Sequence, residues 1–349
     1  MSDDTQNAND DQAAAPVITV GSSPHLADRA WTTRRMMRDV LVALVPALVA
    51  AAVVFGWLPL VKQLAICVVF CVATECAFAA VRRQKSPVGD LSAVLTGVIL
   101  ALSLPWNAPF YVPLLGAVAA IGLGKAVFGG LGTNIFNPAM VGRAFVMLSF
   151  GGVLAAPAYV AGKAQLVATE AMTQATPLTV IKQEGLGALV GMLGESGSDS
   201  VLFRFALGNV NGSLGEVSAL ALLVGGLYLC VRRSASWEIP AGSILGVVVF
   251  GGLASMLSLT QLTVPQQLCG GAFMLGAFFI ATDPVTTPLT RRGKLVFGLG
   301  FGSLVILIRT LSGYPEGVMF AILLMNAATP LINRWTVPRP VGGPTPEGA

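Results

Sequence analysis

The chain of 349 residues is too apolar for a water-soluble domain: apolar residues make up 54% of it, charged residues only 11%, and the mean hydropathy is +0.76. Soluble domains carry roughly 25% charged residues. The net charge is only +4, and no run of Lys or Arg interleaved with aromatic residues indicates nucleic-acid binding. The composition predicts an all-α protein that crosses a lipid bilayer several times.

The N-terminal segment predicts a polar arm. Residues 1–28 are acidic, rich in Asn, Gln and Ala, and lack the apolar core of a cleaved signal peptide. We expect a disordered cytoplasmic arm over residues 1–37.

About ten apolar stretches follow, each close to the roughly 17–25 residues of a membrane-spanning helix. They form two halves of five, over 38–154 and 214–333, and a cytoplasmic tail is expected over 334–349. The predicted spans are 38–58, 61–81, 89–106, 108–128, 136–154, 214–231, 237–258, 266–282, 294–311 and 315–333.

The basic residues predict the orientation, because cytoplasmic loops are enriched in Lys and Arg. With ten spans, all clusters fall on one side, so both termini are expected in the cytoplasm and the polar segment 155–213 on the periplasmic side. The clusters are Arg29, Arg34, Arg35 and Arg38; Arg82, Arg83 and Lys85; Lys125 and Arg143; Arg232 and Arg233; Arg291, Arg292 and Lys294; and Arg334 and Arg339.

Two proline-interrupted segments indicate internal symmetry. Residues 103–109 end the third span, and residues 281–288 end the eighth. Since five is odd, the halves would be inverted relative to each other. Inverted repeats with broken helices are typical of channels and secondary transporters.

The sequence gives little support for a metal site. Cys67 and Cys71 are one helical turn apart and could offer two thiolates to a metal. The single histidine, His25, lies in the N-terminal arm, and no CxxC pair is present. We therefore expect the cysteines to pack between helices, and we expect no metal and no catalytic side chain.

A threonine-rich stretch in the polar segment is a candidate cofactor site. Thr176 precedes Pro177, which favours an extended conformation. By itself this is an ordinary loop threonine. However, residues 173–179, Thr-Gln-Ala-Thr-Pro-Leu-Thr, resemble the flavinylation site of the Rnf electron-transport complex membrane protein RnfD and of its relative NqrB in the sodium-pumping NADH:quinone oxidoreductase. The resemblance implies a covalent FMN phosphoester on Thr176, installed by a flavin transferase that also reads Thr173.

Two positions depart from the pattern that the transferase reads. Glu170 stands where the family has Asp, and Gln174 where it has Gly. Both departures bear on how efficiently the transferase acts on this chain.

A glycine-rich turn precedes the fifth span, over residues 129–139. It lacks the Lys-Ser/Thr ending of a P-loop, and Asn137 before Pro138 is suited to cap a helix. The same stretch is similar to a hallmark of this family near a second, non-covalent flavin, riboflavin. The resemblance makes Asn134 and Asn137 candidate riboflavin ligands. Asp283, in a family-typical stretch, either caps the turn that follows it or faces the same cofactor.

Glu75 is a carboxylate well inside the second span. Such a charge is costly in a membrane and usually functional. The alternative is a structural ion pair with Arg82 or Arg83, two turns away.

The resemblance extends from the first span to residues 326–330 and implies a bacterial inner-membrane subunit of an ion-translocating ferredoxin:NAD oxidoreductase. Electrons would pass through flavins and move Na⁺ or H⁺. The implied partners are other membrane and peripheral subunits, including a second FMN-bearing subunit and iron–sulfur subunits. The alternatives are the NqrB protein of the sodium-pumping oxidoreductase, a urea-transporter-like solute channel, and a non-catalytic scaffold.

Overall fold

The computed structural model describes residues 32–83, 87–154, 178, 181–182, 185, 187, 198–207, 212–313 and 316–338. The cofactor candidates Thr173 and Thr176 lie outside these ranges. The described residues form helices joined by turns, with one isolated β-bridge between Pro105 and Ser213.

The helices follow the apolar stretches of the sequence and are bounded by glycine, proline and capping residues. In chain order they are α1 (Thr33–Ala43), α2 (Val45–Phe55), α3 (Trp57–Val81), η1 (Pro87–Asp90), α4 (Ser92–Ser103), α5 (Tyr111–Ile121), η2 (Gly122–Ala126), α6 (Pro138–Phe150), α9 (Ser198–Leu207), α10 (Ala219–Val231), α11 (Glu238–Met256), α12 (Val264–Cys269), α13 (Phe273–Leu275), η3 (Gly276–Ile280), α14 (Arg291–Leu311) and α15 (Val318–Thr336).

Five helical segments of the described chain are long and apolar enough to cross a membrane: Thr33–Phe55, Trp57–Val81, Glu238–Met256, Arg291–Leu311 and Val318–Thr336. Four shorter apolar helices accompany them: Ser92–Ser103, Tyr111–Ala126, Pro138–Phe150 and Ala219–Val231. The chain is therefore a helical, multi-pass membrane protein. The count of ten spans and the inverted repeat remain predictions.

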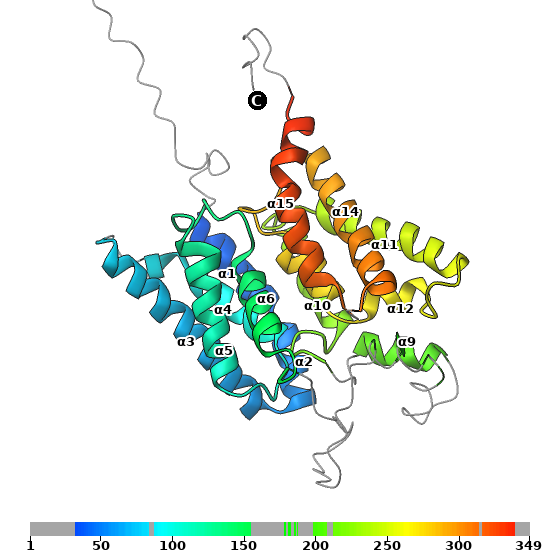
Figure 1. The fold of residues 1–349 in the computed structure, drawn as a ribbon, viewed down its shortest axis with the longest axis horizontal. Helices are drawn as coiled ribbons and strands as arrows, with labels where there is room; N and C mark the ends of the chain where they lie inside the picture. Colours follow the sequence, from blue (N-terminus) through cyan, green and yellow to red (C-terminus); the bar gives the residue numbers. More distant parts are fainter. Residues whose placement is uncertain are drawn as a thin grey trace, which may run out of the picture. The chain divides into compact units, whose positions relative to one another are not determined.

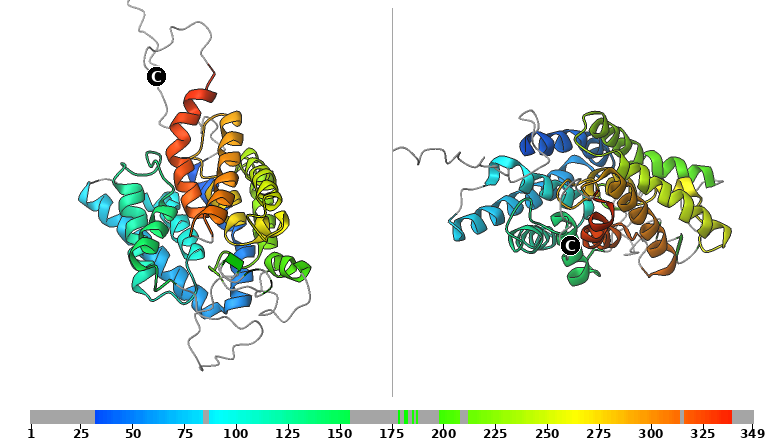
Figure 2. Two further views of the ribbon diagram at one scale, coloured as in Figure 1. Left: turned by 45° about the vertical axis from the view of Figure 1, so that its right-hand side comes forward. Right: turned by 90° about the horizontal axis from the view of Figure 1, so that it is seen from above.

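The helices gather in two groups within residues 33–338. Helices α3, α4, α5 and α6 lie together, and α11, α12, α14 and α15 form the second group (Figures 1 and 2). The groups meet where α6 packs against α15. In addition, α10 packs against α1 and α2, so the N-terminal helices contact the second half of the chain.

Glycines bring the backbones of α11 and α14 into direct contact. A Cβ atom on Gly302 would lie 2.1 Å from the carbonyl oxygen of Ser243, and one on Gly298 would lie 2.3 Å from that of Ile239. Small residues four apart allow such close approach in membranes, where apolar burial does not drive helix association. Gly242 and Gly246 provide the matching spacing on α11.

Two short π-helical segments interrupt regular helices. η2 continues α5, and η3 continues the short helix α13. Each leads into a polar turn, after Ala126 and after Ile280 respectively. Single π-helical turns are rare in proteins as a whole, but many of those known lie at functional sites. The two polar turns that follow η2 and η3 are therefore candidates for such a site.

Gly302→Ala should destabilise the protein by about 1–3 kcal/mol, because the added methyl group collides with the backbone of α11. Gly252→Ala on α11 is the matched control, since its Cβ meets nothing within 4 Å. Because alanine favours a helix over glycine by up to about 1 kcal/mol, the control should be neutral or stabilising. Thermal unfolding in detergent measures both. Equal melting temperatures for the two variants would contradict the close packing.

Candidate functional site

A cavity lies where the two polar turns after η2 and η3 face each other. Its empty volume, which includes open solvent at the mouth, is ≈ 700 Å³. Its apolar walls come from α1, α4 and η3, and its polar residues are Ser92, Thr96, Lys125, Asn134, Asn137, Ser234, Thr282 and Asp283. We call this cavity the turn pocket.

The turn after η2 owes its shape to glycine. Gly129, Gly130 and Gly132 have φ angles of 112°, 117° and 96°, in a region that residues with side chains rarely adopt. This backbone path leads from the end of η2 to Asn134 and then to Asn137 at the start of α6.

The structure brings Asn134 and Asn137 to the turn pocket with different roles. The Asn137 side chain accepts hydrogen bonds from the N–H groups of Ala139 (3.1 Å) and Met140 (3.3 Å), so it caps α6. Asn134 donates its amide N–H to the carbonyl of Phe136 at 3.2 Å. The Asn134 Oδ1 atom is buried and accepts no hydrogen bond from the described protein. A buried acceptor in a pocket wall is suited to a ligand that carries N–H or O–H donors.

Asp283 lines the opposite wall and also caps its turn. Its carboxylate accepts hydrogen bonds from the Val285 N–H and the Thr286 hydroxyl, both at 3.3 Å. Burial raises the pKa of the Asp283 carboxyl, and this effect outweighs those two hydrogen bonds and the charge of Lys125, all of which lower it. Asn137 and Asp283 therefore each cap a turn and also line the turn pocket.

Helix α15 joins the two polar turns. The Asn326 Oδ1 atom accepts the Asn137 N–H at 3.1 Å, and the Asn326 amide donates to the carbonyl of Thr286 at 3.3 Å. Thr329 donates to the same carbonyl at 3.0 Å. Asn326 was not among the residues expected from the sequence to line a site. The available signal was an amide inside an apolar helix, which usually has a partner on a neighbouring segment.

Glu75 forms its ion pair with Lys125, and the structure therefore contradicts the alternative of a pair with Arg82 or Arg83. Lys125 donates to Glu75 Oε1 and to the Ser92 hydroxyl, and both charged residues are almost completely buried. Arg82 instead donates to the carbonyl of Ala126. The position of Lys125 in the sequence predicted a loop charge, but η2 turns its side chain into the bundle toward α3.

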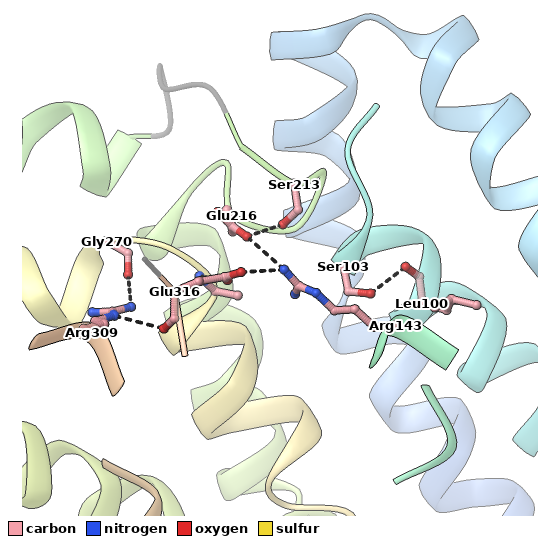
Figure 3. Close-up of polar contacts among 9 residues, drawn as sticks. Leu100, Ser103, Arg143, Ser213, Glu216, Gly270, Arg309 and Glu316 are labelled. Carbon is pink, nitrogen blue, oxygen red and sulfur yellow. Dashed lines mark hydrogen bonds and ion pairs between the residues drawn. The ribbon is translucent and has the colours of Figure 1, made fainter. Parts of the chain in front are cut away.

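A second polar cluster joins the two groups of helices (Figure 3). Arg143 of α6 forms an ion pair with Glu316, which precedes α15, and its guanidinium lies 3.9 Å from Glu216, which precedes α10. Glu316 also accepts the Ala272 N–H at 2.9 Å, at the start of α13. We call Arg143, Glu216, Glu316 and Arg309 the bridging cluster.

Arg309 completes the bridging cluster from α14. It donates to the carbonyls of Gln267 (2.7 Å), Gly270 (2.8 Å) and Glu316 (3.2 Å). Like Lys125, Arg143 was counted as a cytoplasmic charge, but each of these side chains forms an ion pair with a carboxylate inside the bundle, Glu75 and the half-buried Glu316 respectively. Neither Lys125 nor Arg143 is therefore a surface loop charge of the kind that predicts membrane orientation.

Comparison with known proteins decides the family. The profile of the NQR2, RnfD, RnfE family matches residues 19–342. The chain belongs to this family.

Three relatives within the family are similar over nearly their whole length. The chain is 42% identical to the D subunit of the Na⁺-translocating ferredoxin:NAD⁺ oxidoreductase complex of Acetobacterium woodii, over 93% of this chain and 95% of the relative. It is 39% identical to the D subunit of the proton-translocating ferredoxin:NAD⁺ oxidoreductase complex of Clostridium ljungdahlii, over 92% of this chain and 95% of the relative. It is also 39% identical to the D subunit of the ion-translocating oxidoreductase complex of Halorhodospira halophila, over 88% and 91%.

Described residues at and just after the threonine-rich stretch 173–179 are docked on the helices. Leu178 and Ile181 are buried, with 7% and 8% exposure. The Leu178 side chain packs against Gly271, where a Cβ would lie only 2.8 Å from Leu178 Cδ1. Lys182 donates to the carbonyls of Arg309 (2.9 Å) and Ser312, at the end of α14.

The cysteines Cys67 and Cys71 pack inside this family member as predicted from their apolar surroundings. Both are fully buried on α3, and the Cys71 thiol lies 3.9 Å from the carbonyl of Ala117 on α5. Among the described residues, no three His, Cys, Asp or Glu side chains are grouped as a metal site would require.

Proposed function

We propose that this chain is the flavin-bearing membrane subunit of a redox-driven, ion-translocating ferredoxin:NAD⁺ oxidoreductase, corresponding to RnfD of the Rnf complex. The observation that carries the proposal is the agreement of family, length and names. The three relatives are all named as D subunits, and the match covers most of each chain. Their names differ in the ion, Na⁺ or H⁺, and both remain candidates here.

The proposed architecture has ten membrane spans in two inverted halves of five, in the bacterial inner membrane, with both termini in the cytoplasm. The five long and four shorter apolar helices support the span count, together with α12, α13 and η3 as the eighth span. With Lys125 and Arg143 set aside as buried, the other basic clusters still fall on one side.

The turn pocket is the proposed site of a non-covalent riboflavin. The buried Asn134 Oδ1 atom has no donor within the described protein, and a flavin offers N–H and hydroxyl donors. The described lining residues include a single cation, Lys125, whose charge Glu75 balances, while Asp283 adds a carboxylate. This charge distribution disfavours a phosphate group and therefore favours riboflavin over FMN.

The covalent FMN is proposed on Thr176, on the periplasmic side. The motif at 173–179 supports this assignment, together with the docking of Leu178 two residues later. A bound flavin supplies one- and two-electron redox chemistry, and the protein supplies position, charge and exclusion of water. The proposed partners are a flavin transferase, a second FMN-bearing subunit, iron–sulfur subunits and the remaining membrane subunits.

The proposed orientation predicts that a reporter enzyme fused at residue 345 is active in the cytoplasm, and that one fused at residue 165 is active in the periplasm. The physical basis is the retention of Lys and Arg on the cytoplasmic side during insertion. Alkaline phosphatase fusions report a periplasmic position, and fluorescent-protein fusions report a cytoplasmic one. Cytoplasmic activity at residue 165 would reverse the orientation.

Asn134→Leu should lower the affinity of the turn pocket for flavin about tenfold or more, since a buried hydrogen bond contributes about 1–3 kcal/mol when its partner is left unsatisfied. Acid extraction followed by chromatography measures the non-covalent riboflavin per chain. Asn333→Leu is the matched control, because the Asn333 side chain accepts the Leu289 N–H at 3.0 Å and does not line the turn pocket. Unchanged riboflavin in Asn134→Leu would remove this residue from the site.

Thr176→Ala should abolish the fluorescence of the denatured protein band on a gel, because no other hydroxyl occupies the acceptor position of the motif. Thr179→Ala is the control and should remain fluorescent. The helices should still assemble in Thr176→Ala, so its extractable riboflavin should be retained. A fluorescent Thr176→Ala band would contradict the covalent assignment, and a non-fluorescent wild-type band would favour a channel or scaffold.

A further inference from the structure

The ion pair between Glu75 and Lys125 occupies an unusual position in the wall of the turn pocket. Lys125 lines the cavity from η2, whereas Glu75 of α3 does not line it and lies behind the lysine. Glu75 is 5% exposed and Lys125 is 3% exposed. Lys125 therefore links the wall of the cavity to a buried carboxylate outside it.

Packing stability alone gives a weak reason for this arrangement. Moving charges out of water costs free energy that a buried ion pair often only balances, and apolar residues of similar volume are frequently as stable. In addition, Glu75 Oε2 is buried and accepts no hydrogen bond from the described residues. The carboxylate therefore gains fewer hydrogen bonds than its four acceptor sites allow.

The hydrogen bonds of Lys125 leave a donor for the cavity. An ammonium group has three N–H donors. One is directed to Glu75 Oε1 and one to the Ser92 hydroxyl. Ser92 in turn donates to Asp90 at 2.6 Å, which fixes the orientation of its oxygen toward the lysine. Lys125 is thus held by two acceptors, and among the described residues no third acceptor contacts its ammonium group.

We propose that Lys125, positioned by Glu75 and Ser92, sets the reduction potential of the ligand in the turn pocket by stabilising the negative charge that an added electron brings. The proposal rests on the proposed flavin function of this pocket. A positive charge in a wall that excludes water acts more strongly than one at the surface. Glu75 sets how much of that charge reaches the cavity, so it is a positioning residue that does not touch the ligand.

The two partners should therefore act in opposite directions. Lys125→Met removes the cation and leaves the Glu75 carboxylate uncompensated, so the ligand should become harder to reduce. Glu75→Gln removes the balancing negative charge while preserving shape, so the ligand should become easier to reduce. Lys125→Arg keeps the charge and should stay close to wild type.

The test is a spectroelectrochemical titration at fixed pH, in the Thr176→Ala background so that the signal comes from the non-covalent flavin. At the wild-type midpoint potential, Lys125→Met should lower the ratio of reduced to oxidised flavin about tenfold, which is about 59 mV for a one-electron step. Glu75→Gln should raise the ratio by a comparable factor. Glu238→Gln is the matched control, since Glu238 is a buried carboxylate that pairs with Arg291 and does not line the pocket.

The outcomes separate this inference from the proposed function. A parent protein without extractable riboflavin contradicts the proposed function, and the inference fails with it. A parent that retains riboflavin, with Lys125→Met at or above the wild-type potential, overturns the inference alone. If Lys125→Met does not retain flavin, Glu75→Gln decides: a raised potential supports the role of Lys125, and an unchanged or lowered potential overturns it. If the ion pair is purely structural, the Lys125 and Glu75 variants should change the melting temperature and leave the midpoint potential of the flavin unchanged.

Discussion

The carboxylate of Glu316 is the contact on which the arrangement of the described helices depends. It pairs with Arg143 on α6 and accepts the Ala272 N–H where α13 begins. Inside a bilayer, water does not replace a lost partner, so polar groups at interrupted helices need partners within the protein. Glu316 thereby fixes the start of α15 to both groups of helices. Asn326 follows Val318 by eight residues, about 12 Å along the same helix, so the bridging cluster and the turn pocket share one rigid element.

The turn pocket collects the places where the helices depart from regular geometry. Two π-helical segments, a turn with three glycines at positive φ and the cap of α6 all border it. Residues from or next to each departure line the cavity, including Lys125, Asn134, Asn137 and Phe279. Asn137 and Asp283 hold these turns in place through their capping hydrogen bonds, and Asn326 ties the turns together. The residues that shape the pocket are therefore the same residues that stabilise its walls.

The sequence predicted the local features well and the distant partners poorly. Apolar stretches placed the helices, and Asn137 before Pro138 predicted the start of α6. Asn134, Asn137 and Asp283 do lie around one cavity, as the resemblance implied. Lys125 and Arg143 were misjudged, because a charge near the end of an apolar stretch resembles a loop charge. Their partners, Glu75 and Glu316, are 50 and 173 positions away, and only the packing of the helices shows those pairs.

The packing of Leu178 against Gly271 fixes one end of the threonine-rich stretch. Thr176 precedes Leu178 by two residues, so the backbone between them extends at most about 7 Å. The FMN proposed on Thr176 therefore has only two residues of backbone between its attachment point and this contact, and Lys182 binds the end of α14 four residues further along. On that proposal, the effective concentration of the flavin at a neighbouring redox partner should fall with each residue inserted between Thr176 and Leu178.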